Sequence, residues 1–135
     1  MTITAQIRQT ALDLLNFIDA SPSPWHAVQT VTQRLLAAGY TELAETERWG
    51  LSAGGKYFVV RGGASVIAFH LGAGDVVKAG LRIIGAHTDS PGLRLKTNAA
   101  QAADDLVKLG VEVYGGPILA TFTDRDLSLA GRVNV

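Results

Sequence analysis

The sequence contains no cysteine, and this absence narrows the chemistry that the chain can perform. It excludes a disulfide framework, a thiolate zinc site and a cysteine nucleophile, so any metal must be held by histidines and carboxylates. An excess of charge of one sign is also missing, since 12 Lys and Arg residues balance 12 Asp and Glu residues. Without a long basic block, we expect no nucleic-acid partner.

Long apolar runs and several common motifs are missing as well. No uncharged apolar stretch approaches the roughly 20 residues of a transmembrane helix, and the amino terminus does not resemble a signal peptide. We therefore expect no membrane partner and a cytoplasmic location. The sequence has no GxSxG nucleophile elbow, no GxxxxGK[ST] phosphate loop and no GxGxxG after a strand, which argues against those catalytic and nucleotide-binding classes.

Two amphipathic helices are predicted near the amino terminus. Apolar side chains recur at spacings of three and four over residues 3–18, and this stripe is expected to pack on a sheet. The second helix is expected to begin with Ser23 as its N-cap and Pro24 at its first position. Gly39 suits its C-terminal cap, because glycine readily adopts the left-handed conformation that ends many helices.

The rest of the chain is predicted to be mainly strands. Residues 56–61 and 64–70 flank Gly62 and Gly63, and a two-residue loop of glycines favours a tight hairpin. A short apolar run predicts a buried strand over residues 81–86. Further strands are expected at residues 110–116 and from residue 130 onward, with a loop or short helix at residues 97–109. The chain stops within the last of these, which suggests a truncated protein.

The clearest chemical signal is the sequence GAHTDSP at residues 85–91. It follows the predicted strand, and ligands of open α/β sheets bind at the carboxyl ends of strands. His87 and Asp89 are two residues apart, so they can converge on one side of an extended segment. A neutral imidazole can ligate a divalent metal, while a carboxylate can orient it, join the ligands or transfer a proton. A hydrogen-bonded pair in a loop is the commoner alternative.

Other candidate residues have weaker support. His26, in the first turn of the second helix, is expected to have a structural or supporting role, and His70, at a strand end, a solvated or capping role. Arg125 is a weak candidate for contacting a substrate or a neighbouring subunit, with a local ion-pair cluster as the alternative. No histidine follows His87, although a hydrolytic zinc site needs at least three protein ligands.

Together, these motifs resemble those of the M18 family of zinc aminopeptidases, the aspartyl aminopeptidases, over nearly the whole chain. The resembling segments keep the family's order and read FIDASPSPWHAV at 17–28, GGKYF at 54–58, RIIGAHTDSP at 82–91, GVEVYGG at 110–116 and DRDLSLAGRV at 124–133. Two positions depart from the family pattern. Gly92 stands where relatives often have cysteine, and residues 121–123 read TFT instead of TWF, which weakens the expectation that this segment contacts substrate.

The resemblance implies an α/β fold, namely the amino-terminal part of a zinc-aminopeptidase-type sheet with flanking helices. This part would run into the start of an inserted β-rich oligomerisation domain. Residues 1–109 would then belong to the catalytic domain and residues 110–135 to the beginning of the inserted domain. A homo-oligomer is also implied, a dodecamer for full-length members of the family.

For function, the resemblance implies a cytoplasmic metalloaminopeptidase that removes amino-terminal Asp or Glu from peptides with two Zn²⁺ ions in each complete site. His87 would be a metal ligand, and Asp89 would support that ligand and the catalytic centre. The remaining ligands and the general base would lie outside this chain, so we expect it to be inactive alone. The alternatives are a noncatalytic interaction module that binds full-length subunits and a structural scaffold without peptidase ancestry.

Overall fold

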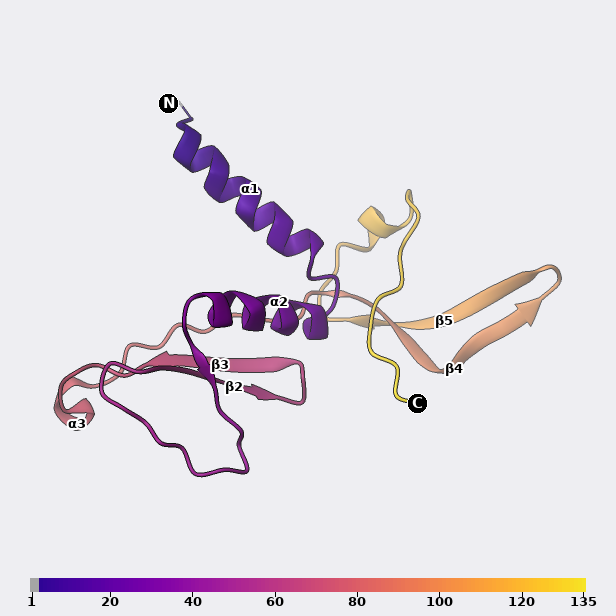
Figure 1. The fold of residues 1–135 in the computed structure, drawn as a ribbon. Helices are drawn as coiled ribbons and strands as arrows, with labels where there is room; N and C mark the ends of the chain where they lie inside the picture. The colour runs from indigo at the N-terminus through magenta and orange to yellow at the C-terminus, as the bar shows by residue number, and fades with distance from the viewer. Residues whose placement is uncertain (1–2) are drawn as a thin grey trace. The chain divides into compact units, whose positions relative to one another are not determined.

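The described residues form two compact units. The computed structural model describes residues 3–135, and within this range every side chain except that of Ala103. The first unit ends at Thr88 and includes Ala130–Val135, and the second comprises Asp89–Leu129. Helices and sheets both occur, which confirms the predicted α/β class (Figure 1). The division expected between residues 109 and 110 stays a prediction. None of the described helices has the length and apolar character to cross a membrane.

Both predicted helices form, and local capping explains where they begin and end. Helix α1 spans Ala5–Asp19 and helix α2 spans Pro24–Ala37. Ser23 is the N-cap of α2, and Pro24 stands in its first turn, where the missing N–H breaks no helical hydrogen bond. After α2, Gly39 has a φ of 79°, which glycine adopts without steric cost. The sequence-based boundaries of α2 are therefore confirmed.

A three-stranded sheet forms the centre of the first unit. It has the order β1-β2-β3, made of Thr41–Glu42, Lys56–Arg61 and Ser65–His70. The predicted hairpin is present, but its loop has three residues, 62–64, because Arg61 pairs with Ser65. Gly62 and Gly63 both have positive φ values, which explains the need for two glycines.

Helix α2 packs against this sheet and shares a small core with it (Figure 1). The buried apolar residues are Ala27 and Val28 of α2, and Tyr57, Phe58 and Val59 of β2. Strand β2 lies between the other two strands, so consecutive residues can be buried on both faces of the sheet. The Phe58 side chain is completely buried, and it is the largest such side chain in the described chain.

The apolar stripe of α1 does not pack on a sheet, contrary to the prediction. No residue of α1 is buried, and its larger apolar side chains are about half exposed. The helix contacts α2 instead, where Arg34 donates hydrogen bonds of 2.8 and 2.9 Å to the two carboxylate oxygens of Asp13. The helix that packs on the three-stranded sheet is α2.

The predicted buried strand at residues 81–86 is also absent. This segment follows the short helix α3, Val76–Ala79, and pairs with none of the described strands. Its apolar side chains are exposed, with exposed fractions of 75% for Leu81, 85% for Ile83 and 97% for Ile84. A strand needs a hydrogen-bonding neighbour, and the apolar sequence alone does not supply one.

The second unit is an antiparallel hairpin followed by a short 3₁₀ helix. Strands β4, Gly92–Ala103, and β5, Leu106–Tyr114, pair on both sides of an irregularity between Leu95 and Ala100, and the 3₁₀ helix spans Leu119–Phe122. Residues 97–109, expected to be a loop or short helix, are therefore strand and turn. Asp104, with a φ of 52°, begins the two-residue turn, and aspartate tolerates that left-handed conformation better than most residues.

The carboxyl-terminal segment belongs to the first unit but forms no strand, contrary to the prediction. Its Arg132 Nη1 donates a hydrogen bond of 3.1 Å to the carbonyl oxygen of Gly62. The guanidinium carbon also lies 5.1 Å from the centroid of the Trp25 ring, a cation–π distance. A side-chain contact with the hairpin loop therefore holds this segment, in place of backbone pairing.

Candidate metal-binding and catalytic site

His87 lies at the end of the exposed segment 81–86, and its side chain is exposed. The next residue anchors this segment, because Thr88 Oγ1 donates a hydrogen bond of 2.8 Å to the carbonyl oxygen of Ala64 in the hairpin loop. The chain bends at Thr88 and does not continue as a regular strand. The β2–β3 hairpin therefore holds the backbone next to His87 even though segment 81–86 has no strand partner among the described residues.

Asp89 begins the second unit, and it is half-buried at the base of the β4–β5 hairpin. The Tyr114 hydroxyl donates a hydrogen bond to Asp89 Oδ2 across 25 residues of sequence. The Arg94 guanidinium lies over the Tyr114 ring, with its carbon 3.3 Å from the ring centroid. One carboxylate oxygen of Asp89 thus accepts a hydrogen bond from Tyr114, whose position depends on the register of the hairpin.

The hydrogen bond to Asp89 raises the pKa of Tyr114 above its usual value, and Coulombic repulsion from the same carboxylate adds to this effect. The neutral hydroxyl can donate to Asp89, whereas an ionised phenolate cannot donate and would be repelled. Arg94 acts in the opposite direction, since a nearby positive charge favours the phenolate. Tyr114 is therefore a hydrogen-bond donor at neutral pH.

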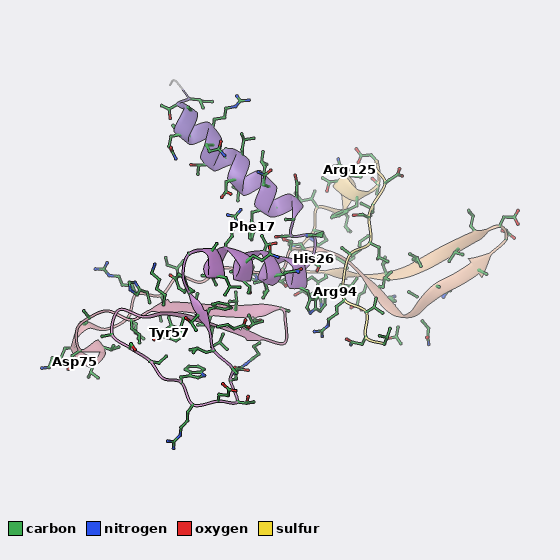
Figure 2. The ribbon with its side chains drawn as sticks, in the orientation of Figure 1. Phe17, His26, Tyr57, Asp75, Arg94 and Arg125 are labelled. Carbon is green, nitrogen blue, oxygen red and sulfur yellow. The ribbon has the colours of Figure 1, made fainter. Side chains whose placement is uncertain are left out.

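The other residues singled out in the sequence have local partners. Ser23 Oγ and His26 Nδ1 share a hydrogen bond of 2.7 Å within the helix cap, and His70 Nε2 lies 3.2 Å from the carbonyl oxygen of Gly54. Arg125, in the segment after the 3₁₀ helix, donates through Nε to the neighbouring Asp124 at 3.2 Å (Figure 2). Both side chains of that ion pair are largely exposed, so it contributes little stability.

His87 and Asp89 have the right chemistry for zinc, but they are too few for a complete site. A protein zinc site normally has at least three protein ligands, drawn from histidine, cysteine and carboxylates. Within residues 3–135, no group of three or more such side chains is placed to hold a metal ion. The residues present therefore fit a zinc centre in part.

The sequence indicates His87 and Asp89 as candidate site residues, and it gives no signal for the contact of Asp89 with Tyr114 or for the stacking of Arg94. In the sequence, Tyr114 is only one residue of the strand predicted at 110–116, within the segment GVEVYGG. Its contact with Asp89 depends on the β4–β5 register, which pairs Gly92 with Tyr114. That register could not be predicted while residues 97–109 were expected to be a loop or helix.

Comparison with known proteins identifies the family. A family model described as aminopeptidase I zinc metalloprotease (M18) matches residues 17–135. The chain belongs to the M18 family. It corresponds to the family's amino-terminal portion. A probable M18 family aminopeptidase 2 from Ectopseudomonas mendocina is 53% identical over 120 residues, and one from Clostridium acetobutylicum is 48% identical over 126 residues. The matches cover 89% and 93% of this chain but only 28% and 29% of these M18 relatives.

Solved structures of M18 proteins have the same arrangement of elements. A complex of Ape4 and Nbr1 contains a chain with a TM-score of 0.83 and 40% identity, covering 93% of this chain and 25% of that one. The S. cerevisiae mApe1 dodecamer gives a TM-score of 0.80 at 28% identity, covering 90% of this chain and 28% of that one. The M18 chain described here thus spans less than a third of each of these proteins.

The M18 relatives allow a test of the exposed segment 81–86. In a chimera, the matching segment of the E. mendocina protein is replaced by this chain. We expect Ile84→Lys to leave the thermal midpoint of the chain alone nearly unchanged, because the side chain is 97% exposed. In the chimera, we expect the additional residues to cover this segment, so the same change should bury an unpaired charge and lower the midpoint by about 5 °C or more.

The matched control for this prediction is Ile84→Leu, which keeps the apolar character and should change neither midpoint appreciably. Both variants are measured by circular dichroism during heating. Equal small effects of Ile84→Lys in the chain and in the chimera would mean that the longer protein leaves this segment exposed.

Proposed function

We propose that this chain supplies the amino-terminal part of a metalloaminopeptidase that removes Asp or Glu from the amino termini of peptides. The observation that carries the proposal is the match of residues 17–135 to a zinc metalloprotease family of aminopeptidases. The HTD sequence at residues 87–89 supports it, because it has an imidazole and a carboxylate two positions apart in the matched segment. The part of the enzyme outside this chain would complete the site.

In this proposal His87 is a zinc ligand, acting through a neutral ring nitrogen. Asp89 holds the catalytic centre in position and favours the ligating form of the imidazole, as carboxylates beside zinc-bound histidines commonly do. A pair of zinc ions, when bound, would polarise the scissile carbonyl and supply a nucleophilic hydroxide at neutral pH. The remaining ligands and the general base are proposed to lie outside this chain, which would make the chain inactive alone.

We further propose a cytoplasmic homo-oligomer, a dodecamer for the longer protein. The support is the likeness to the S. cerevisiae mApe1 dodecamer. Residues 110–135 are proposed to begin an inserted oligomerisation domain, and the part of β5 that falls in this range, residues 110–114, agrees with a β-rich domain. Analytical ultracentrifugation of the chimera tests the assembly, since a monomer at micromolar concentration would contradict it.

The substrate preference is tested with four aminoacyl p-nitroanilides in matched pairs, Asp with Asn and Glu with Gln. Each pair differs in charge but hardly in size, so the comparison isolates a cationic group in the pocket. We expect kcat/KM of the zinc-loaded chimera to favour the acidic member of each pair by at least about tenfold. Equal hydrolysis of both members of each pair would agree with the proposed aminopeptidase activity but contradict the preference for acidic residues. If no aminoacyl substrate is hydrolysed, the proposed aminopeptidase activity is contradicted.

A further inference from the structure

We propose that Tyr114 is a positioning residue for Asp89, acting through the hydrogen bond that its hydroxyl donates to Asp89 Oδ2. This inference rests on the proposed function, because it assigns Tyr114 a role in holding the carboxylate that supports the zinc ligand His87. Tyr114 itself is not proposed to touch the metal or the substrate. It extends the site from the HTD sequence to the end of strand β5.

The hydrogen bond fixes the rotation of the Asp89 carboxylate. A carboxylate turns easily about its terminal bond, because that torsion has broad energy wells. A donor held at one oxygen selects one orientation and thereby sets the direction of the other oxygen. Phenol hydroxyls that donate to a carboxylate form charge-assisted hydrogen bonds, which are stronger than neutral ones.

The phenol is itself held in place on one face of the hairpin. The β4–β5 register pairs Gly92 with Tyr114 and Arg94 with Glu112, so Arg94 and Tyr114 are diagonal neighbours on the same face. The Arg94 guanidinium covers the Tyr114 ring at 3.3 Å from its centroid. This stacking limits the rotation of the ring and so limits the positions that its hydroxyl can take.

The backbone at the base of the hairpin is closely packed around the same contact. Gly115 follows Tyr114 with a φ of 70°, and a Cβ atom placed on it would lie 3.3 Å from Pro91 Cβ. A side chain there would therefore be strained by both its conformation and its neighbour. Glycine at this position lets the end of β5 approach the segment that follows Asp89, which brings the phenol within reach of the carboxylate.

The test is Tyr114→Phe in the chimera, which removes the hydroxyl and keeps the ring beneath Arg94. We expect zinc affinity and kcat each to fall by up to about 10- to 100-fold, because that is the usual loss when the direct partner of a metal ligand is removed, and Tyr114 acts through such a partner, Asp89. KM should change less than about twofold, since Tyr114 does not contact substrate. Zinc affinity is measured by competition with a chromogenic chelator, which does not depend on turnover.

Tyr57→Phe is the matched control, because it also removes a phenol hydroxyl that takes part in a hydrogen bond. Tyr57 accepts from the backbone N–H of Ser52 at 2.9 Å within the first unit. The Tyr57→Phe substitution should leave zinc affinity and kcat unchanged. Circular dichroism establishes that both variants remain folded. If Tyr57→Phe produced the same losses as Tyr114→Phe, the effect would be a general loss of structure and the positioning role would be wrong.

A double-mutant cycle with Asp89→Asn decides whether Tyr114 acts through Asp89. We expect Tyr114→Phe to cost little more once Asp89 has been replaced, because both changes disrupt one unit. Fully additive losses, or a Tyr114→Phe variant equal to the parent chimera, would overturn the inference while leaving the proposed function intact. If the parent chimera binds zinc but hydrolyses no aminoacyl substrate, the proposed function is wrong. The zinc affinity of Tyr114→Phe then still tests the positioning role, which an affinity equal to that of the parent would contradict.

Discussion

Replacement of His87 by Ala in the zinc-loaded chimera should lower kcat/KM by more than about 100-fold, because removal of a direct ligand must cost more than the loss of its supporting partners. The same variant should bind less zinc per subunit when equilibrated with a limiting concentration of the metal. Hydrolysis of Glu p-nitroanilide gives the kinetic result, and atomic absorption gives the zinc content. The expected loss reflects a missing ligand and not a fold defect, since the His87 side chain is exposed in the chain alone.

His70→Ala is the control for this result. His70 is also exposed, and its ring nitrogen lies 3.2 Å from the carbonyl oxygen of Gly54 at the edge of the hairpin. Its replacement should leave zinc content unchanged and kcat/KM within about twofold, as for most exposed positions away from a site. Equal behaviour of the two histidine variants would contradict the assignment of His87 as a ligand.

Phe58→Ala should destabilise the first unit by about 3–5 kcal/mol, the usual cost of truncating a buried phenylalanine. The Phe58 side chain is completely buried, in a core that has five buried apolar residues within the described part of the chain. Small domains have total stabilities of about 5–15 kcal/mol, so a loss of this size could unfold the unit. Urea unfolding of the chain, followed by circular dichroism, measures the change in free energy.

The matched comparison is Ile67→Ala in the same hairpin. Ile67 lies on β3 opposite Val59, but its side chain is 71% exposed. Its truncation should cost less than about 1 kcal/mol, because little apolar surface leaves the protein interior. A Phe58→Ala variant as stable as Ile67→Ala would show that the α2–sheet core does not determine the stability of the first unit.

The elements predicted correctly from the sequence are those set by local interactions. Ser23 and Pro24 start α2 through capping and a fixed φ angle, and Gly39 ends it through a left-handed conformation. The hairpin around Gly62 and Gly63 depends in the same way on residues that permit positive φ angles. Each of these signals lies within a few residues of the feature that it determines, so the sequence is sufficient.

The elements that were missed depend on partners distant in sequence. Segment 81–86 has the composition of a buried strand, yet the described residues give it no neighbouring strand and it remains exposed. In the β4–β5 hairpin, the pairing shifts between Leu95 and Ala100, where four residues of β4 stand opposite Gly110. This irregularity breaks the period-two pattern by which strands are recognised, so residues 97–109 could not be identified as strand.

In the candidate site, too, the features that could be predicted depend on residues close in sequence, and the others depend on distant residues. His87 and Asp89 could be identified because the HTD sequence keeps both residues within a short segment. The Tyr114 contact joins residues 25 positions apart and depends on strand register, so no local pattern indicates it. The ligands proposed to complete the zinc centre are more distant still, since the match to the E. mendocina relative covers only 28% of that protein.

The most direct test of the central proposal compares hydrolysis of Glu p-nitroanilide by the chain alone and by the chimera, each supplied with zinc. If the chain carries only part of a metalloaminopeptidase site, the chimera should turn over substrate and the chain alone should not. His87→Ala in both proteins excludes a contaminating peptidase. Turnover by the chain alone that disappears with His87→Ala would contradict the proposal, because a complete site would then form from these residues.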